Sequence, residues 1–208
     1  ANFTANNLDN WKKVYSGPDK LQTFIKHATV GSAIAQKMSN IGLENEYETN
    51  LIIGFWTSYY ATKSEEITKR MGKTPTIIKI FNSGDPNVLS LVDIGNLMKA
   101  VCATEHYFNE TEVDPELFTK NWGVNSSGDW GLMQVNQKSI SDANKKGGGY
   151  QWFEKLDFLQ LDENGIPLYQ NYNNFFNIGA GIGEFFCSLY EGYKNGKNNF
   201  FDSDLTIK

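Results

Sequence analysis

The chain has 208 residues, enough for one domain or for one domain with a structured extension. Hydrophobic residues make up 40% and aromatic residues 14%, which suits a packed core and argues against a disordered chain. The net charge is −5 and the basic residues are scattered, so we expect neither nucleic acid nor an anionic membrane surface as the main partner. The longest apolar run, residues 51–56, is too short for a membrane span, which needs about 20 residues, so no membrane span is expected.

The first third of the chain is predicted to be largely helical. Residues 1–18 are polar and rich in asparagine, and we expect turns there. Apolar side chains recur at a spacing near 3.6 over residues 19–38 and over residues 44–70, which predicts two helices, the second with the apolar middle LIIGFWTSYY. Residues 73–87 are rich in turn residues and favour a loop or a strand. Residues 1–85 carry no recognisable motif. We expect them to form an N-terminal helical extension that packs on the rest of the chain or contacts a protein partner.

A third helix is predicted by its start and by its apolar stripe. Asp85 can cap this helix, and Pro86 suits its first position. The residues that follow at steps of three and four are Val88, Leu91, Val92, Gly95, Met98, Val101 and Cys102. Three residues further the same stripe reaches Glu105. Burial on an apolar face would raise the pKa of the Glu105 carboxyl and suit it to general acid catalysis, whereas a glutamate at a helix end can also simply face water.

The rest of the chain combines irregular segments with further helices. Residues 109–125 carry acids and turn residues, which favour a small hairpin or flap. Residues 150–161 look helical, and a last helix is expected to begin near Asn177. Its packing face would consist of Ile178, Ile182, Phe185, Phe186 and Leu189. The expected fold class is mainly α, a helical core with a small β or irregular insertion.

The segment NSSGDWGLMQVN, residues 125–136, fits neither helix nor strand periodicity. Gly131 allows a tight turn and the close approach of a ligand. Gln134 and Asn136 offer the paired donors and acceptors that sugar hydroxyl and acetamido groups require. The ring of Trp130 suits stacking on a pyranose. These residues make the segment a candidate wall of a sugar-binding cleft.

Three motifs follow one another along the chain. The predicted third helix ends in Glu105-His106-Tyr107-Phe108, a Glu-x-x-Phe pattern. Residues 126–134, SSGDWGLMQ, nearly match Ser-x-x-Gly-x-x-Gly-Leu-Met-Gln, with one glycine a position early. Residues 177–181, NIGAG, match Asn-Ile-x-x-Gly. In this order the motifs resemble the lysozyme-like superfamily, in particular the lytic transglycosylases of the soluble and type IV secretion-associated kinds.

The resemblance covers roughly residues 86–196 and implies a lysozyme-like catalytic domain over residues 86–208. It implies that Glu105 is the catalytic acid/base of an enzyme that cleaves peptidoglycan glycan strands. The family's late Ala-Tyr-Asn-Ala-Gly motif is not found, and its tyrosine would correspond to Tyr193 or Tyr190. From the resemblance and from side-chain chemistry, the candidates for binding the glycan are Ser126, Ser127, Trp130, Gly131, Met133, Gln134, Asn136, Asn177 and Tyr193.

The role of Asp129 decides between two possible activities. The string DWGLMQVN also resembles Asp-Tyr-Gly-Ile-Leu-Gln-Ile-Asn of animal c-type lysozymes, in which that Asp is the second catalytic carboxylate. If Asp129 faces the cleaved bond, the enzyme would be a muramidase that hydrolyses with Glu105 and Asp129. If Asp129 is only a turn residue, Glu105 would work alone as a lytic transglycosylase and leave 1,6-anhydromuramic ends. We favour the transglycosylase; a non-catalytic wall-binding module of a secretion system or phage particle is the alternative of another class.

Cys102 and Cys187 fall on two helices that the resemblance expects to pack together. A disulfide between them would suit the extracytoplasmic location of a wall enzyme, in the periplasm, in the cell wall or secreted. Two buried free thiols are the alternative. With only two histidines and no metal-type spacing, we expect no metal site and no cofactor.

Overall fold

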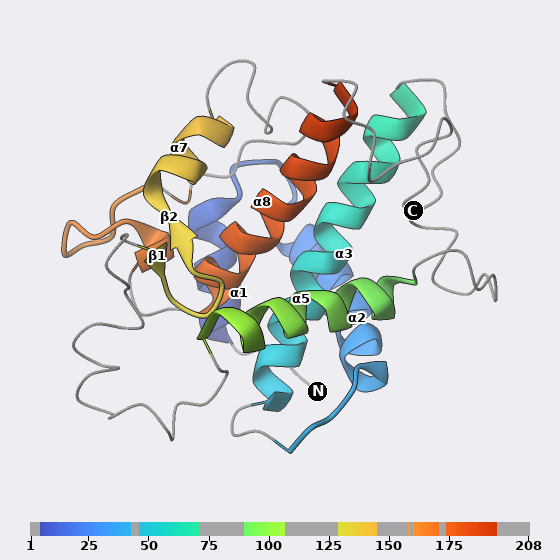
Figure 1. The fold of residues 1–208 in the computed structure, drawn as a ribbon. Helices are drawn as coiled ribbons and strands as arrows, with labels where there is room; N and C mark the ends of the chain where they lie inside the picture. The colour runs from blue at the N-terminus through green and yellow to red at the C-terminus, as the bar shows by residue number, and fades with distance from the viewer. Residues whose placement is uncertain are drawn as a thin grey trace.

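The computed structural model describes residues 5–42, 46–70, 90–106, 129–144, 158, 160–170 and 174–194. The helices in these segments are α1 (Ala5–Val14), α2 (Lys20–Lys37), α3 (Glu46–Arg70), α5 (Leu91–His106), α7 (Gln137–Asn144) and α8 (Asn174–Lys194). Strands β1 (Asp129–Trp130) and β2 (Val135–Asn136) form a two-stranded antiparallel sheet (Figure 1). The described part is therefore mainly α with a small β element, which confirms the expected class at that level.

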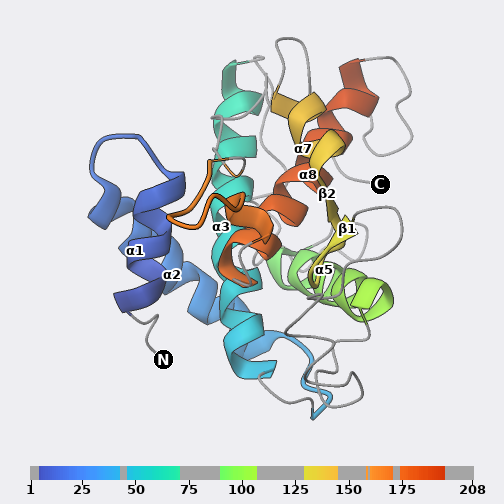
Figure 2. The ribbon, with the colours of Figure 1, turned by 90° about the vertical axis from the view of Figure 1, so that its left-hand side faces the viewer.

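Helix α3 is the centre of the molecule. Every residue from Leu51 to Ala61 is buried, because α2, α5 and α8 all pack against this helix (Figures 1 and 2). Trp56 is fully buried, and its indole N–H donates to the carbonyl oxygen of Phe175 at the start of α8 over 3.0 Å. The apolar middle predicted for this helix is thus the core of the fold.

Residues 5–14 form helix α1, so the expectation of turns in this region is wrong. The residues that α1 buries are Asn7, Asn10, Trp11 and Val14, which share one helical face. Trp11 stacks on Tyr15 with ring centroids 4.5 Å apart and meets the edge of Phe55 at 5.3 Å. The helical pattern was hidden because two of the buried positions are occupied by asparagine.

One hydrophobic cluster joins the two halves of the chain. It includes Trp11 and Phe55 from the expected N-terminal extension, and Met98, Leu132 and Phe186 from the expected catalytic half. The boundary between residues 85 and 86 lies outside the described residues. Helices α1 to α3 therefore supply the middle of a shared core.

Two helix starts differ from the predicted ones. Ser90 caps α5, because its hydroxyl oxygen accepts the N–H of Asp93 over 3.0 Å while its own N–H donates to the Asp93 carboxylate over 2.9 Å. The helix therefore begins at Leu91, and the expected cap at Asp85 lies outside the described residues. Helix α8 begins at Asn174, slightly before the predicted Asn177.

The helix predicted over residues 150–161 is not found where the structure describes this segment. Phe158 lies in a turn, and Leu161 forms a β-bridge with Pro167. The carbonyl oxygens of Phe158 and Gln160 accept backbone N–H groups from the segment after the turn, so they are not available for a helix. The remainder of that segment, and residues 109–125, lie outside the described residues.

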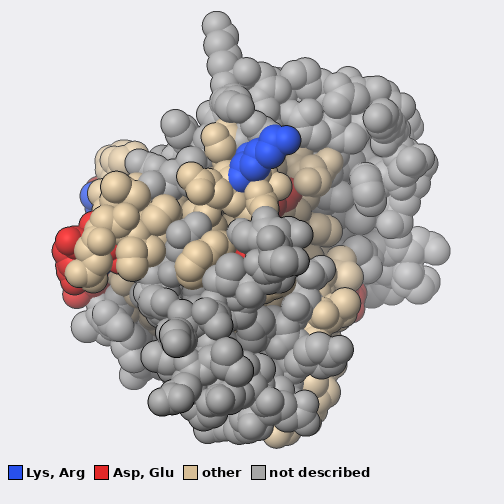
Figure 3. Space-filling view, turned by 60° about the vertical axis from the view of Figure 1, so that its left-hand side comes forward, with Lys and Arg blue, Asp and Glu red and all other residues tan. Residues whose placement is uncertain are grey.

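Basic side chains are sparse among the described residues on one face of the molecule. On the face shown in Figure 3, the lysine and arginine side chains of the described residues form no extended patch. In the described segments, no helix is both long enough and apolar enough to cross a membrane.

Candidate functional site

The turn of the β1–β2 hairpin contacts the C-terminal part of α5. Glu105 lies in the last turn of α5, and its side chain is outside the described part of the structure. Cys102, one helical turn earlier, is fully buried, and its thiol lies 3.0 Å from the thioether sulfur of Met133 in the hairpin turn. In both ribbon views the hairpin turn lies over this end of α5 (Figures 1 and 2). The segment 129–136 is thus held beside the helix end that carries Glu105.

The hairpin is closed by hydrogen bonds of its own residues. Asp129 pairs with Asn136 and Trp130 with Val135, and the turn between them runs from Gly131 to Gln134. Gly131 has a φ of 70° and Gln134 a φ of 47°, both in the left-handed region. The side-chain amide of Gln134 donates to the carbonyl oxygen of Gly131 over 2.9 Å. Gln134, predicted to bind the glycan, therefore also stabilises the turn on which it lies.

Asn177 fastens the hairpin to α8. Its side chain is fully buried; its Oδ1 accepts the N–H of Met133 over 2.9 Å, and its Nδ2 donates to the carbonyl oxygens of Trp130 over 2.8 Å and Tyr169 over 3.2 Å. A buried amide with these partners satisfies backbone groups that would otherwise lose their hydrogen bonds. The structure thus gives Asn177 a positioning role for the hairpin; its contact with the glycan stays a prediction.

Two glycines allow this close contact. A Cβ on Gly131 would lie 2.6 Å from Cγ of Asn177, and a Cβ on Gly181 would lie 2.5 Å from Cβ of Met133. Both distances are far below a normal van der Waals contact, so larger residues would push the hairpin off α8. The Gly-Leu-Met and Asn-Ile-x-x-Gly motifs therefore occur together because one packs directly on the other.

Glu184 on α8 is a half-buried glutamate whose Oε1 is buried, and it was not among the predicted site residues. Burial, and secondly the negative charge of Asp129, raises the pKa of Glu184 to about 7. Within the described part of the chain, its Oε1 is buried and has no hydrogen-bond partner. Asn177, Gly181 and Glu184 follow one another at helical spacing and face the hairpin together. Glu184 stands in the apolar run GIGEFFC, which is the same signal that drew attention to Glu105.

Asp129 is tied into the hairpin. Its Oδ1 accepts a hydrogen bond from Nδ2 of Asn136 over 2.9 Å, across the first pair of the sheet. Asp129 is half-buried, as are Trp130 and Asn136. The Asp129 side chain thus lies at the edge of the hairpin, bonded to the neighbouring strand and close to Glu184.

The remaining predicted residues divide into two groups. Ser126 and Ser127 lie outside the described residues, and Tyr193 lies in the last turn of α8 with its side chain outside the described part. Cys102 and Cys187 are buried free thiols, so the disulfide is not formed and the alternative of two thiols is the one present. Burial raises the pKa of Cys102 to about 12, which keeps it an unreactive thiol packed on Met133.

No protein-family model, curated protein or solved structure matches this chain. The resemblance to lysozyme-like enzymes therefore rests on the three sequence motifs alone.

Proposed function

We propose that this protein is a lytic transglycosylase that cleaves the β-1,4 bond between N-acetylmuramic acid and N-acetylglucosamine in peptidoglycan. The observation that supports the proposal is that the second and third motifs meet at Met133, beside the helix that carries Glu105. The sulfur of Met133 contacts Cys102, one turn before Glu105, and its N–H binds Asn177. With peptidoglycan as its substrate, the enzyme would act outside the cytoplasm.

The proposed reaction uses Glu105 twice. As an acid it gives its proton to the glycosidic oxygen while the bond from that oxygen to C1 of the muramic residue breaks. As a carboxylate it then takes the proton of the C6 hydroxyl of the same residue, whose oxygen forms the new bond to C1. The product is a 1,6-anhydro ring, and no water is consumed. No metal or cofactor takes part in these steps.

Asp129 favours this route over the two-carboxylate alternative. Its Oδ1 accepts the Asn136 amide, so Asp129 already has a structural role in the hairpin. A retaining hydrolase would need Asp129 about 5 Å from Glu105 with an oxygen directed at C1. In the proposed route Asp129 shapes the hairpin, and its charge is not consumed in a covalent step.

The test is digestion of purified peptidoglycan by the wild type and by Glu105→Gln. We expect loss of nearly all release of soluble fragments in Glu105→Gln, because glutamine can neither give nor take the proton. Glu48→Gln, a change at an exposed glutamate of α3, is the matched control and should digest like the wild type. Digestion retained by Glu105→Gln would remove the assignment of this residue. Wall binding by the wild type without any release would instead favour a non-catalytic wall-binding module.

A further inference from the structure

Helix α5 is held at three successive turns along one of its faces. Gly95, Lys99 and Cys102 follow one another at helical spacing, and all three are buried. Gly95 packs on the end of α2, Lys99 contacts the connection between α2 and α3, and Cys102 contacts the hairpin turn. Segments from both halves of the chain therefore hold the helix that carries Glu105.

Polar groups bind the α2–α3 connection to α5. The ammonium group of Lys99 donates to the carbonyl oxygen of Ser39 and forms a buried ion pair with Glu46. The side-chain oxygen of Asn96, three residues before Lys99, accepts the backbone N–H of Ser39 over 2.9 Å. Ser39 thus binds α5 through both its N–H and its carbonyl group. A slide of the helix past this connection would break both hydrogen bonds.

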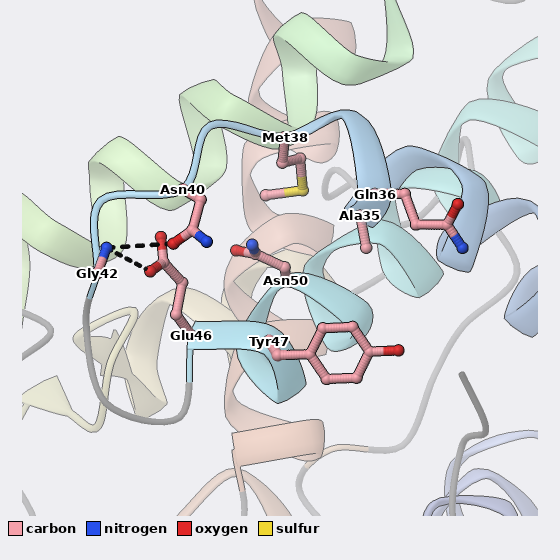
Figure 4. A pocket seen from close by; sticks show the side chains of 8 residues that line it. All are labelled: Ala35, Gln36, Met38, Asn40, Gly42, Glu46, Tyr47 and Asn50. Carbon is pink, nitrogen blue, oxygen red and sulfur yellow. Dashed lines mark hydrogen bonds between the residues drawn. The ribbon is translucent and has the colours of Figure 1, made fainter.

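Glu46 adds the start of α3 to this contact. Its carboxylate accepts the backbone N–H of Ile41 over 2.7 Å and that of Gly42 over 2.8 Å, the second of which is drawn in Figure 4. A buried carboxylate that pairs with a cation and accepts two N–H groups is held in one place. The contact therefore joins α2, α3 and α5 at one point. We call its residues, Ser39, Glu46, Asn96 and Lys99, the α5 clamp.

The α5 clamp supplies directional contacts where the neighbouring packing is apolar. A Cβ on Gly95 would lie 3.2 Å from the sulfur of Met38 and 3.3 Å from Cγ2 of Ile34, so α5 lies close against α2. Apolar burial has no preferred direction, whereas hydrogen bonds weaken steeply when their angles change. A buried ion pair adds little net stability, because both charges lose water, and its best-attested use is to fix a register. The clamp is therefore suited to fix the position of α5 along its axis.

A displacement of α5 at the clamp is carried to its other end. Lys99 and Glu105 are separated by six residues, which is about 9 Å along a helix. Cys102 lies between them and contacts Met133 of the hairpin. A shift of the helix at Lys99 therefore changes the Cys102–Met133 contact and moves Glu105. A misplacement of about 1 Å can lower a catalytic rate about a hundredfold.

We propose that Lys99 and Glu46 are positioning residues, which place Glu105 beside the hairpin by fixing α5 along its axis. The consequence for catalysis rests on the transglycosylase function; the mechanical coupling between the α5 clamp and the hairpin does not. The first 85 residues then take part in placing the catalytic group, through Ser39 and Glu46.

The test replaces the ion pair by neutral side chains of similar size, in the double variant Glu46→Gln with Lys99→Met. This variant leaves no unpaired charge, and the glutamine oxygen can still accept a backbone N–H of the connection. Asn96→Ala is a second, milder variant, since it removes one hydrogen bond of the clamp at a half-buried position and keeps the ion pair. The matched control is Glu66→Gln with Lys63→Met, the same two changes at an ion pair of 3.4 Å further along α3.

The first readout is the ε-methyl NMR signal of Met133 in the full chain labelled with ¹³C-methyl methionine, assigned with Met133→Leu. Met133 belongs to the hairpin and contacts Cys102, so its signal reports a shift of α5 and not a local change at Lys99. We expect the signal to move in both clamp variants and to stay in place in the control. An unchanged Met133 signal in both clamp variants would overturn the coupling.

The second readout is the rate of fragment release from purified peptidoglycan as a function of wall concentration. In the double variant we expect the maximal rate to fall about tenfold or more. The half-saturating concentration should stay within about twofold of the wild type, since neither residue is a predicted glycan contact. An unchanged maximal rate together with a moved Met133 signal would overturn the positioning role. A wild type that releases no fragments would contradict the proposed function, whereas a moved Met133 signal would still support the coupling.

Discussion

Oδ1 of Asn177 accepts the backbone N–H of Met133 over 2.9 Å, and this hydrogen bond joins the start of α8 to the turn of the hairpin. The same side chain donates to two carbonyl oxygens, so one buried amide fixes three segments. Asn177 therefore helps to hold residues 129–136 in place beside α5.

Asn177→Ala should destabilise the protein by about 3 kcal/mol, because it leaves buried backbone groups of Trp130 and Met133 without partners. The measurement is urea denaturation of both proteins. Asn164→Ala, at an exposed position in a turn, is the control and should change the free energy of unfolding little. A loss below about 1 kcal/mol for Asn177→Ala would mean that the hairpin is held by other contacts.

Asp129→Asn separates the two catalytic routes. Asparagine keeps an oxygen that can accept the Asn136 amide, so the hairpin should survive. If Glu105 works alone, the rate of wall digestion should fall by no more than about tenfold, since one charge near the site is lost. A muramidase that depends on Asp129 would lose on the order of a thousandfold or more. Initial rates on purified peptidoglycan distinguish the two outcomes.

Glu184 should make the fold less stable as pH rises. Its pKa is 4.5 in the unfolded chain and about 7 in the fold, so the native state binds more protons between these values. The free energy of unfolding should therefore fall by about 3 kcal/mol between pH 4.5 and pH 8 through this group alone. In Glu184→Gln this component should be absent, whereas Glu163→Gln, at an exposed position, should keep it. Parallel pH profiles for Glu184→Gln and the wild type would contradict the burial of an uncharged carboxyl group.

His27 should make the fold less stable as pH falls, which is opposite to the effect of Glu184. Burial, together with the positive charges of Lys26 and Lys63, lowers its pKa to about 3, and its Nδ1 lies 2.9 Å from the hydroxyl of Ser58. The unfolded state therefore binds more protons below pH 6.5, and stability is lost as pH falls. Between pH 7 and pH 4.5 the loss through His27 is about 2.5 kcal/mol, close to the gain through Glu184.

The effects of Glu184 and His27 on the pH dependence of stability thus nearly cancel in the wild type. When one of the two residues is replaced, the pH dependence caused by the other should become measurable. His27→Gln should become more stable as pH falls from 7 to 4.5, and Glu184→Gln should become less stable. Denaturant unfolding at three pH values measures both. If His27→Gln has the same pH dependence as the wild type, the imidazole is not buried in its neutral form.

The sequence predicted those elements whose periodicity is carried by apolar side chains. Helices α2, α3 and α8 were found for this reason, and their predicted starts are within a few residues of the observed ones. Helix α1 was missed because asparagines occupy part of its buried face. The start of α5 was placed too early because Asp85-Pro86 offers a plausible cap. The competing capping-box pattern Ser90-x-x-Asp93, which the sequence also shows, was overlooked.

The sequence predicted which segments form the candidate site, but not the structural role of each residue in it. The motifs around Glu105, Met133 and Asn177 indicated which parts of the chain belong together. Two features of the site were not predicted: the burial of Asn177 and the close packing of Met133 on Gly181. Both depend on contacts between segments more than 40 residues apart in the chain, such as the Met133–Asn177 bond. Glu184 was overlooked although it stands in an apolar run, the same signal that singled out Glu105.

We propose that Glu105 cleaves wall glycan by transglycosylation. The most direct measurement is mass spectrometry of the fragments that the wild type releases from purified peptidoglycan, with Glu105→Gln alongside. We expect muropeptides that end in 1,6-anhydromuramic acid, lighter by one water than the hydrolysis products, and we expect none from Glu105→Gln. Fragments with reducing muramic ends, or the same fragments from Glu105→Gln, would contradict the claim.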